Sequence, residues 1–232
     1  IRHLIAADRL DRGALMEMLS RLQAMEKDYP DPLDCYRVEA AGDTALFRLM
    51  RENPREARPF FEGPYGAAPE GMADRAFREV DQIERDRAQI WNLLIAYVSE
   101  PYWERDPDRF QREFERLKAT LHPIAVHHMP KLDVADTRAL VARTRLHLAQ
   151  LLAALAAFRL VEETFPRRLA DLVPTYLEKV PIDPFTGGEF GYVVSFEGRR
   201  VTAYSLGPDK KDDQARVEYD QSKGDYSEGD IF

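Results

Sequence analysis

The residues best suited to chemistry by type and spacing lie in the acidic stretch near the end of the chain. Between positions 209 and 230 there are eight Asp or Glu and four Lys or Arg. Calcium takes about six to eight oxygen ligands in a flexible geometry, so a loop dense in Asp suits it. The spacing of Asp209, Asp212 and Asp213 is not that of an EF-hand. The stretch is equally typical of a solvated acidic surface whose carboxylates are neutralised by its own cations, Lys210, Lys211, Arg216 and Lys223.

Histidines form a second candidate group, because imidazoles at close spacing bind zinc or copper. The group comprises His122, His127, His128 and His147. Prolines at 123 and 130 predict a loop around the first three, and adjacent histidines point in different directions. No Cys or carboxylate stands at an obvious ligand spacing. We therefore interpret these histidines as polar residues of a loop or a helix end.

Carboxylates and aromatic residues in two other places bear on an enzymatic function. Glu162 and Glu163, with Asp171 nearby, could be read as a catalytic pair, but neighbours on a helix point about 100° apart and cannot face one substrate together. An aromatic group would line a pocket for a sugar or a peptide, or would pack at a helix junction: Trp91, Tyr97, Tyr102 and Trp103. The sequence has no glycine-rich phosphate cradle, serine-nucleophile elbow or zinc-protease motif.

Composition sets the limits within which these candidates must work. A chain of 232 residues with 44% apolar and 32% charged residues suits one large or two small globular domains. The single cysteine, Cys35, excludes an intramolecular disulfide framework and a multi-cysteine zinc site. A net charge of −8 argues against a general nucleic-acid binder. The longest apolar run is too short for a membrane span, and the chain begins at Ile1 rather than Met, so we expect any anchor to lie outside this sequence.

Helical periodicity dominates the first 165 residues. It predicts helices over 6–27, 43–52 and 73–99, and Asp106-Pro107 is typical of the start of another. A further long helix, over 136–164, is apolar nearly all round. Such a helix is expected to be central and buried on several faces.

The pattern changes after Phe165-Pro166, where three prolines exclude a continuous helix. Stretches rich in Tyr, Val and Phe predict strands over 190–196 and 200–205. Glu197-Gly198 between them is typical of a tight turn. The last third of the chain therefore reads as a small antiparallel β-meander followed by the acidic loop.

Several short motifs in this last third stand in the order found in one known family. They are Ala154–Arg159, Phe165-Pro166, Leu169–Pro174, Tyr176-Leu177, Val180-Pro181, Asp183–Gly187, Gly191-Tyr192, Tyr204–Asp209 and Gly229–Ile231. Together they resemble the globular domain of the major pseudopilins of type II secretion systems. The resemblance covers about a third of the chain and depends on the motifs in combination.

The resemblance implies a long helix laid on a small antiparallel sheet, followed by a loop that binds calcium through carboxylates and backbone carbonyls. Asp209 and Asp230 match the family's positions in this loop, and Leu206 would offer its carbonyl oxygen. Further candidates follow by proximity alone, namely Asp212, Asp213 and Asp225. Calcium is the only cofactor that the resemblance implies.

The chain departs from that family ahead of the pseudopilin-like module. A long stretch of helical protein precedes the module's helix, and the prepilin leader motif is missing, so pilus assembly does not follow. We therefore predict an α+β protein of two domains. Residues 1–135 form a helical bundle, and residues 136–232 form a long helix packed on a β-meander with an acidic C-terminal loop.

The predicted function is non-enzymatic. We expect a bacterial envelope or secretion-associated protein whose helical domain binds a protein partner. It would be periplasmic or in the cell envelope, attached to a membrane only through an anchor outside this sequence, with no nucleic-acid partner. Two alternatives stay open: a hydrolase or sugar-acting enzyme with its site in the loops of the helical domain, and a structural module with no ligand.

Overall fold

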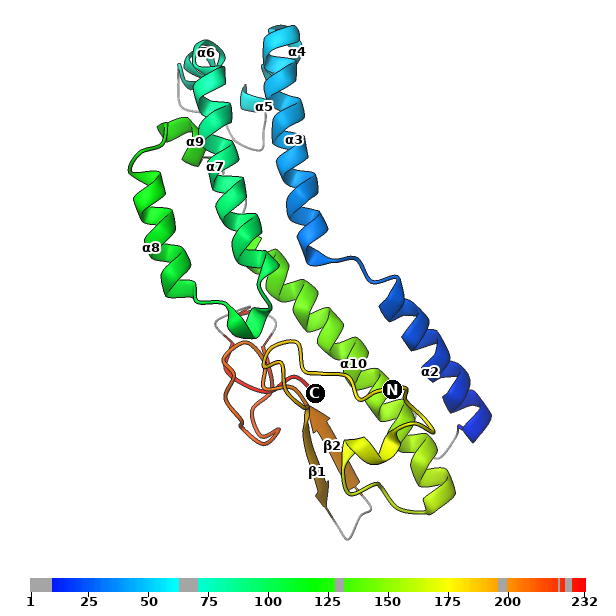
Figure 1. The fold of residues 1–232 in the computed structure, drawn as a ribbon. Coiled ribbons are helices and arrows are strands. Elements are labelled where there is room, and N and C mark those ends of the chain that lie inside the picture. Colours follow the sequence, from blue (N-terminus) through cyan, green and yellow to red (C-terminus); the bar gives the residue numbers. More distant parts are fainter. Residues whose placement is uncertain (1–9, 63–70, 128–131, 196–199, 221, 224–226) are drawn as a thin grey trace. The chain divides into compact units, whose positions relative to one another are not determined.

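The structure is a computed structural model that describes residues 10–62, 71–127, 132–195, 200–220, 222–223 and 227–232. The protein is mostly helical, with a two-stranded antiparallel sheet, and is α+β as the sequence predicts (Figure 1). It divides into two compact units. The helical unit is Asp31–Leu132, and the mixed unit combines the chain up to Pro30 with Asp133–Phe232. Residues 10–30 therefore belong with the C-terminal part, whereas the sequence-based division placed them with the helical bundle.

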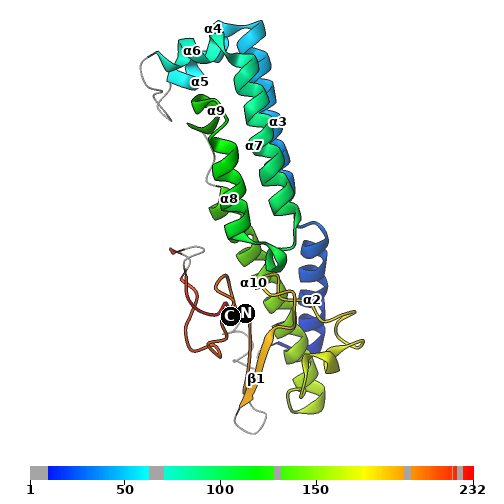
Figure 2. The same cartoon turned by 60° about the vertical axis from the view of Figure 1, so that its left-hand side comes forward.

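The described part of the helical unit contains only helices. They are α3 (Pro32–Glu52), α4 (Pro54–Ala57), α5 (Pro59–Glu62), α6 (Met72–Arg78), α7 (Val80–Ser99), η1 (Tyr102–Glu104), α8 (Pro107–Lys118) and α9 (Pro123–His127). Helices α3 and α7 lie side by side in both views, and α8 and α9 contact α7 (Figure 1 and Figure 2).

Helix α3 is longer than the sequence analysis predicted. The Asp31 side chain accepts a hydrogen bond from the Leu33 N–H at 3.0 Å and so caps the helix. Pro32 stands in the first turn, where its missing N–H has no helical partner to lose. The predicted short helix over 43–52 is therefore corrected to Pro32–Glu52.

Two further predictions in this unit are corrected. The predicted helix over 73–99 is interrupted at Glu79, which leaves the helical region with φ −112° and ψ 20°. The Glu79 N–H closes α6 by donating to the Arg75 carbonyl at 3.0 Å, and α7 starts afresh one residue later. The segment after His122, predicted as a loop, contains the short helix α9, with Pro123 at its first position.

Buried apolar side chains form two clusters in the helical unit. One cluster joins α3, α6, α7 and α9, and the other joins α3 and α7 to the segment around Leu121. A buried ion pair lies among the helices: Arg87 Nε donates to Asp43 Oδ2 at 2.6 Å. The same oxygen accepts the indole N–H of Trp91 at 2.6 Å, and Arg87 also donates to the Ala125 carbonyl at 2.7 Å. This network ties α3 and α7 to α9.

The mixed unit consists of α2 (Arg12–Lys27), α10 (Leu132–Glu162), η2 (Leu169–Leu172), β1 (Gly191–Ser195) and β2 (Arg200–Tyr204). The helix predicted over 6–27 begins at Arg12, where Asp11 accepts the Ala14 N–H at 2.8 Å. Positions 6–9 lie outside the described residues. The long helix predicted over 136–164 extends instead from Leu132 to Glu162.

Helix α10 is the central element of the mixed unit. Five of its apolar residues on several faces have no exposed surface: Leu151, Ala153, Ala154, Leu155 and Ala157. The prediction that this helix is buried on several faces is confirmed. By length and composition Asp136–Glu162 could also cross a membrane, although 61% of its most apolar window is buried within the protein.

The two predicted strands are present and pair in an antiparallel register from Gly191 opposite Tyr204 to Ser195 opposite Arg200. The turn predicted at Glu197-Gly198 lies outside the described residues. The Tyr192 hydroxyl donates to the Pro166 carbonyl at 2.8 Å and so fixes β1 to the segment that leaves α10. Beyond β2 an antiparallel bridge joins Ser205 to Ile231, and a parallel bridge joins Glu218 to Asp230.

Candidate functional site

The acidic loop is closed where β2 ends. Ser205 and Ile231 exchange two backbone hydrogen bonds of 2.8 and 2.9 Å. Asp183 lies beneath them with no exposed surface and accepts hydrogen bonds from the Ser205 hydroxyl (2.8 Å) and the Leu206 N–H (3.2 Å). Burial raises the pKa of Asp183, against the opposing effect of these hydrogen bonds. Asp183 therefore positions Leu206. The sequence did not indicate this contact, although Asp183 lies within the motif Asp183–Gly187.

Two glycines allow the loop and the chain end to meet. Gly207 has φ 71° and Gly229 has φ 112°, a region that L side chains rarely adopt. A Cβ on Gly207 would lie 2.7 Å from the Gly229 carbonyl oxygen. The close approach of these two backbones therefore requires glycine. Asp209 lies two residues after Gly207, and Asp230 directly follows Gly229.

Asp230 is the most unusual carboxylate of the loop. It has no exposed surface, and its Oδ2 accepts the Ala215 N–H at 2.7 Å. Its Oδ1 is buried and has no hydrogen-bond partner among the described residues. Burial raises the pKa of Asp230 against the effect of the backbone N–H groups of Ala215 and Asp213, and the charges of Asp213 and Asp212 act in the same direction as burial. An unpartnered buried carboxylate oxygen is costly, so this position suits a cation.

Asp209 carries the second such oxygen. Its Oδ1 accepts the Lys211 N–H at 3.2 Å, and its Oδ2 is buried without a partner in the described chain. Asp213 is half-buried, and its charge acts on Asp230. Asp225 lies outside the described residues. Two of the predicted ligand residues, Asp209 and Asp230, therefore each have a carboxylate oxygen with no hydrogen-bond partner among the described residues.

Other residues of the loop are already engaged. Asp212 Oδ1 accepts the Tyr204 hydroxyl and the Gln214 N–H, each at 2.9 Å. Burial, helped by Asp212, raises the pKa of Tyr204 to about 12. Within the described ranges, Lys211, Arg216 and Lys223 form no ion pair with the loop's carboxylates.

The oxygen atoms present would supply part of the coordination shell of a calcium ion. Asp209 and Asp230 each offer an oxygen that no described residue partners, and calcium accepts backbone carbonyls as further ligands. No three His, Cys, Asp or Glu side chains gather closely enough to hold a metal in the part of the chain that the structure describes. A calcium ion here would therefore rely on two carboxylates together with carbonyl oxygens such as that of Leu206.

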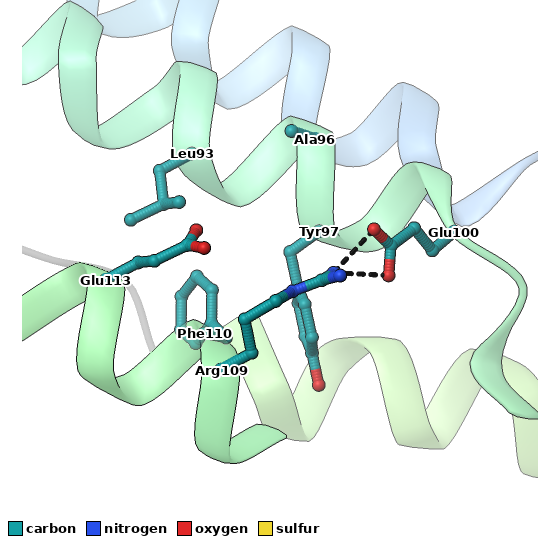
Figure 3. Close-up of a pocket in the computed structure, with 7 residues that line it drawn as sticks. All are labelled: Leu93, Ala96, Tyr97, Glu100, Arg109, Phe110 and Glu113. Carbon is teal, nitrogen blue, oxygen red and sulfur yellow. Dashed lines mark hydrogen bonds and ion pairs between the residues drawn. The ribbon is translucent and has the colours of Figure 1, made fainter. Parts of the chain in front are cut away.

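A pocket of about 210 Å³ lies in the helical unit between α7 and α8 (Figure 3). Its lining residues are Leu93, Ala96, Tyr97, Glu100, Arg109, Phe110 and Glu113. Of the four aromatic residues proposed for a pocket, Tyr97 lies in it. Trp91 is buried against Asp43, and Tyr102 packs under the Arg105 guanidinium, 5.5 Å from the ring centre.

The other predicted constellations are not brought together. His122 and His147 belong to different units, and His128 lies outside the described residues. The Asp171 carboxylate accepts the Arg168 N–H at 3.1 Å and serves as a cap of η2. Glu163 follows the end of α10 in a left-handed conformation with φ 60°.

Comparisons with protein-family models, curated proteins and solved structures find no match to this chain. What the fold and the loop define is an α+β protein with a helical unit and a closed acidic loop.

Proposed function

We propose that the protein is a non-enzymatic bacterial envelope or secretion-associated protein. In this proposal the mixed unit is a pseudopilin-like module whose C-terminal loop is held by calcium, and the helical unit binds a protein partner. The observation that supports the proposal most is that two buried oxygens, Asp209 Oδ2 and Asp230 Oδ1, have no hydrogen-bond partner in the described part of the chain. They lie in a loop whose closure requires Gly207 and Gly229.

Extracellular calcium modules bind weakly, with dissociation constants of about 10⁻⁴ to 10⁻³ M. An ion held only by the native state stabilises it in proportion to RT ln(1 + [L]/Kd). A site of about 10⁻⁴ M at roughly 10 mM calcium therefore adds about 2.7 kcal/mol. A periplasm exposed to outside calcium would supply the ion, which links the loop to the proposed location.

Thermal unfolding in EGTA and in millimolar calcium tests the loop. We expect calcium to raise the unfolding temperature by several degrees in the wild type and to have little effect in Asp209→Asn and Asp230→Asn. Glu228→Gln is the matched control, because it removes an exposed charge from the same loop and leaves both oxygens in place. A rise equal in all four proteins, or no rise in the wild type, contradicts a calcium loop.

The location has an independent test in the single cysteine. Cys35 is exposed, so a maleimide that passes outer-membrane pores but not the inner membrane can reach it in a periplasmic protein. We expect modification in intact cells expressing the full-length gene, and none in Cys35→Ser. Modification that occurs only after lysis contradicts the envelope location.

A further inference from the structure

The pocket between α7 and α8 has a fixed aromatic wall. The Tyr97 and Phe110 ring centroids are 4.6 Å apart, and Phe114 stacks on Phe110 at 6.0 Å. The Arg105 guanidinium covers Tyr97 at 5.5 Å from its ring centre. Leu93 lies on the α7 side, so an aliphatic chain entering the pocket would meet apolar surface from both helices (Figure 3).

The charges around the pocket are unequal. Arg109 donates to both carboxylate oxygens of Glu100, at 2.6 and 2.7 Å, so these two charges offset each other. The Glu113 carboxylate extends over the pocket toward Leu93 instead of toward Arg109 (Figure 3). No residue in the described ranges forms a hydrogen bond or an ion pair with Glu113. The charge of Glu113 also raises the pKa of Arg109, after the larger effect of Glu100. The pocket therefore combines an apolar floor with a net negative charge, because its lining has two glutamates and one arginine.

We propose that this pocket receives a lysine or arginine side chain of a protein partner. The aliphatic stem lies against Leu93 and Phe110, and the cation faces Glu113. Long basic side chains bury their methylene stems on apolar surface while the charge stays at the edge, which is the arrangement that this pocket offers. A cation near an aromatic face gains further attraction.

The size of the pocket argues for a side chain of a polypeptide. About 210 Å³ accommodates one long side chain, so the remainder of the ligand lies outside it. Ala96 and Glu113 at its rim are exposed, and a peptide backbone could rest there. The inference deepens the proposed partner-binding role of the helical unit and rests on it; the partner is one that presents a basic residue.

Methyl NMR of the full chain tests the proposal with defined probes. We expect N-acetyl-lysine methylamide to shift the Leu93 and Ala96 methyl signals saturably, with a dissociation constant on the order of 1–10 mM, because one side chain supplies little binding energy alone. The arginine derivative should act in the same way. The neutral norleucine derivative should bind at least about twofold more weakly, because it lacks the charge that meets Glu113.

Variants separate the pocket from general surface charge. Glu113→Gln should weaken lysine binding about two- to fivefold, the range of an exposed ion pair. Glu115→Gln removes the same charge from the same helix, outside the pocket, and should leave binding unchanged. Ala96→Leu fills an exposed rim position of α7 and should abolish the shifts without unfolding the helix.

Three results overturn the proposal. They are the absence of saturable shifts, equal binding of the norleucine derivative, and equal effects of the two glutamine variants. None of them involves Cys35 labelling or the calcium response. If the lysine derivative fails to bind while Cys35 is labelled in intact cells, the pocket proposal is wrong and the envelope proposal stands. If the lysine derivative binds while Cys35 is labelled only after lysis, the envelope proposal alone is wrong.

Discussion

His147 on α10 and Glu26 on α2 form a contact that joins these two helices. The Nε2 atom of His147 lies 2.7 Å from Glu26 Oε1, and its Nδ1 atom lies 3.1 Å from the Ile182 carbonyl oxygen. The His147 side chain is only 6% exposed. Gln150 donates to the other Glu26 oxygen at 2.8 Å. One carboxylate of α2 is therefore within hydrogen-bond distance of two side chains of α10.

The partner of Nδ1 determines where His147 carries a hydrogen. A carbonyl oxygen only accepts, so Nδ1 of His147 must carry a hydrogen toward the Ile182 oxygen. We expect ¹⁵N NMR of the folded protein to show Nδ1 of His147 protonated. His122 is the internal control, because its Nδ1 accepts the Ile124 N–H at 3.2 Å and so carries no hydrogen. An Nδ1 signal of His147 that matches that of His122 would contradict the assignment.

Glu26 makes this contact sensitive to acid. Burial acts to raise the pKa of Glu26, but the hydrogen bond from Gln150 and the charge and hydrogen bond of His147 outweigh it, and the net pKa is lowered from 4.5. Arg143 acts in the same direction. A carboxylate with a lowered folded-state pKa stabilises the protein fully above its unfolded pKa, and this contribution disappears as pH falls through the folded value.

Glu26→Gln should therefore cost about 1–2 kcal/mol of unfolding free energy at pH 7, allowing for partial exposure of the carboxylate. The difference from wild type should shrink below pH 4.5, where the wild type also loses the charge. Urea unfolding at several pH values measures both quantities. Glu17→Gln, which removes an exposed carboxylate of the same helix, should change stability by less than about 0.5 kcal/mol. A difference that stays constant with pH would contradict the role of the Glu26 charge.

Asp43 should be sensitive to substitution. Its Oδ2 accepts from both Arg87 and Trp91, and the Arg87 side chain is 8% exposed. Asp43→Ala would remove the carboxylate that faces this buried guanidinium and should cost about 3–5 kcal/mol. Urea unfolding followed by tryptophan fluorescence measures the loss.

The control for Asp43 is Asp34→Ala on the same helix. Asp34 pairs with Arg37 at the surface, where the carboxylate is 60% exposed, and its loss should cost less than about 1 kcal/mol. If the two variants are equally stable, the buried network around Arg87 does not hold the helical unit together.

Local sequence signals predicted most elements of the fold, because caps, prolines and residue periods act within a few residues. The strands at Gly191–Ser195 and Arg200–Tyr204 lie within the predicted ranges. The break at Glu79 has no proline or glycine to mark it. The pairing of His147 with Glu26 joins residues 121 positions apart, and nothing local to either residue indicates it.

The candidate site was predictable only in part for the same reason. Asp209 and Asp230 were candidates from motif and composition. Which of their oxygens are left unpartnered depends on Ala215 and Lys211, whose backbone N–H groups are placed by the folded loop. Glu113 has no sequence signal of its own, because the Arg109 guanidinium forms its hydrogen bonds with Glu100 in the folded unit.

Replacing Gly207 in the acidic loop should destabilise the protein, whereas replacing Gly42 in α3 should not. Gly207→Ala places a methyl group 2.7 Å from the Gly229 carbonyl oxygen at φ 71° and should cost at least about 1 kcal/mol through strain. Gly42→Ala lies in α3 with nothing within 4 Å and should stabilise the protein by about 0.5–1 kcal/mol. Thermal unfolding of the two variants measures the opposite signs. A neutral Gly207→Ala would mean that the loop and the chain end do not meet as closely as the structure places them.

Calcium binding by the loop should depend on pH through Asp230. Burial and the neighbouring charges of Asp213 and Asp212 raise the pKa of Asp230 above 3.8, and only the ionised carboxylate binds calcium. Affinity should therefore fall on acidification at a higher pH than an ordinary aspartate would give, and calcium should release a proton there. Isothermal titration at a series of pH values in two buffers of different ionisation enthalpy measures both. Asp213→Asn should shift the loss of affinity to lower pH, because it removes a charge that favours protonation of Asp230. An affinity that stays constant down to the ordinary pKa of aspartate would show that the buried Asp230 carboxylate does not hold the ion.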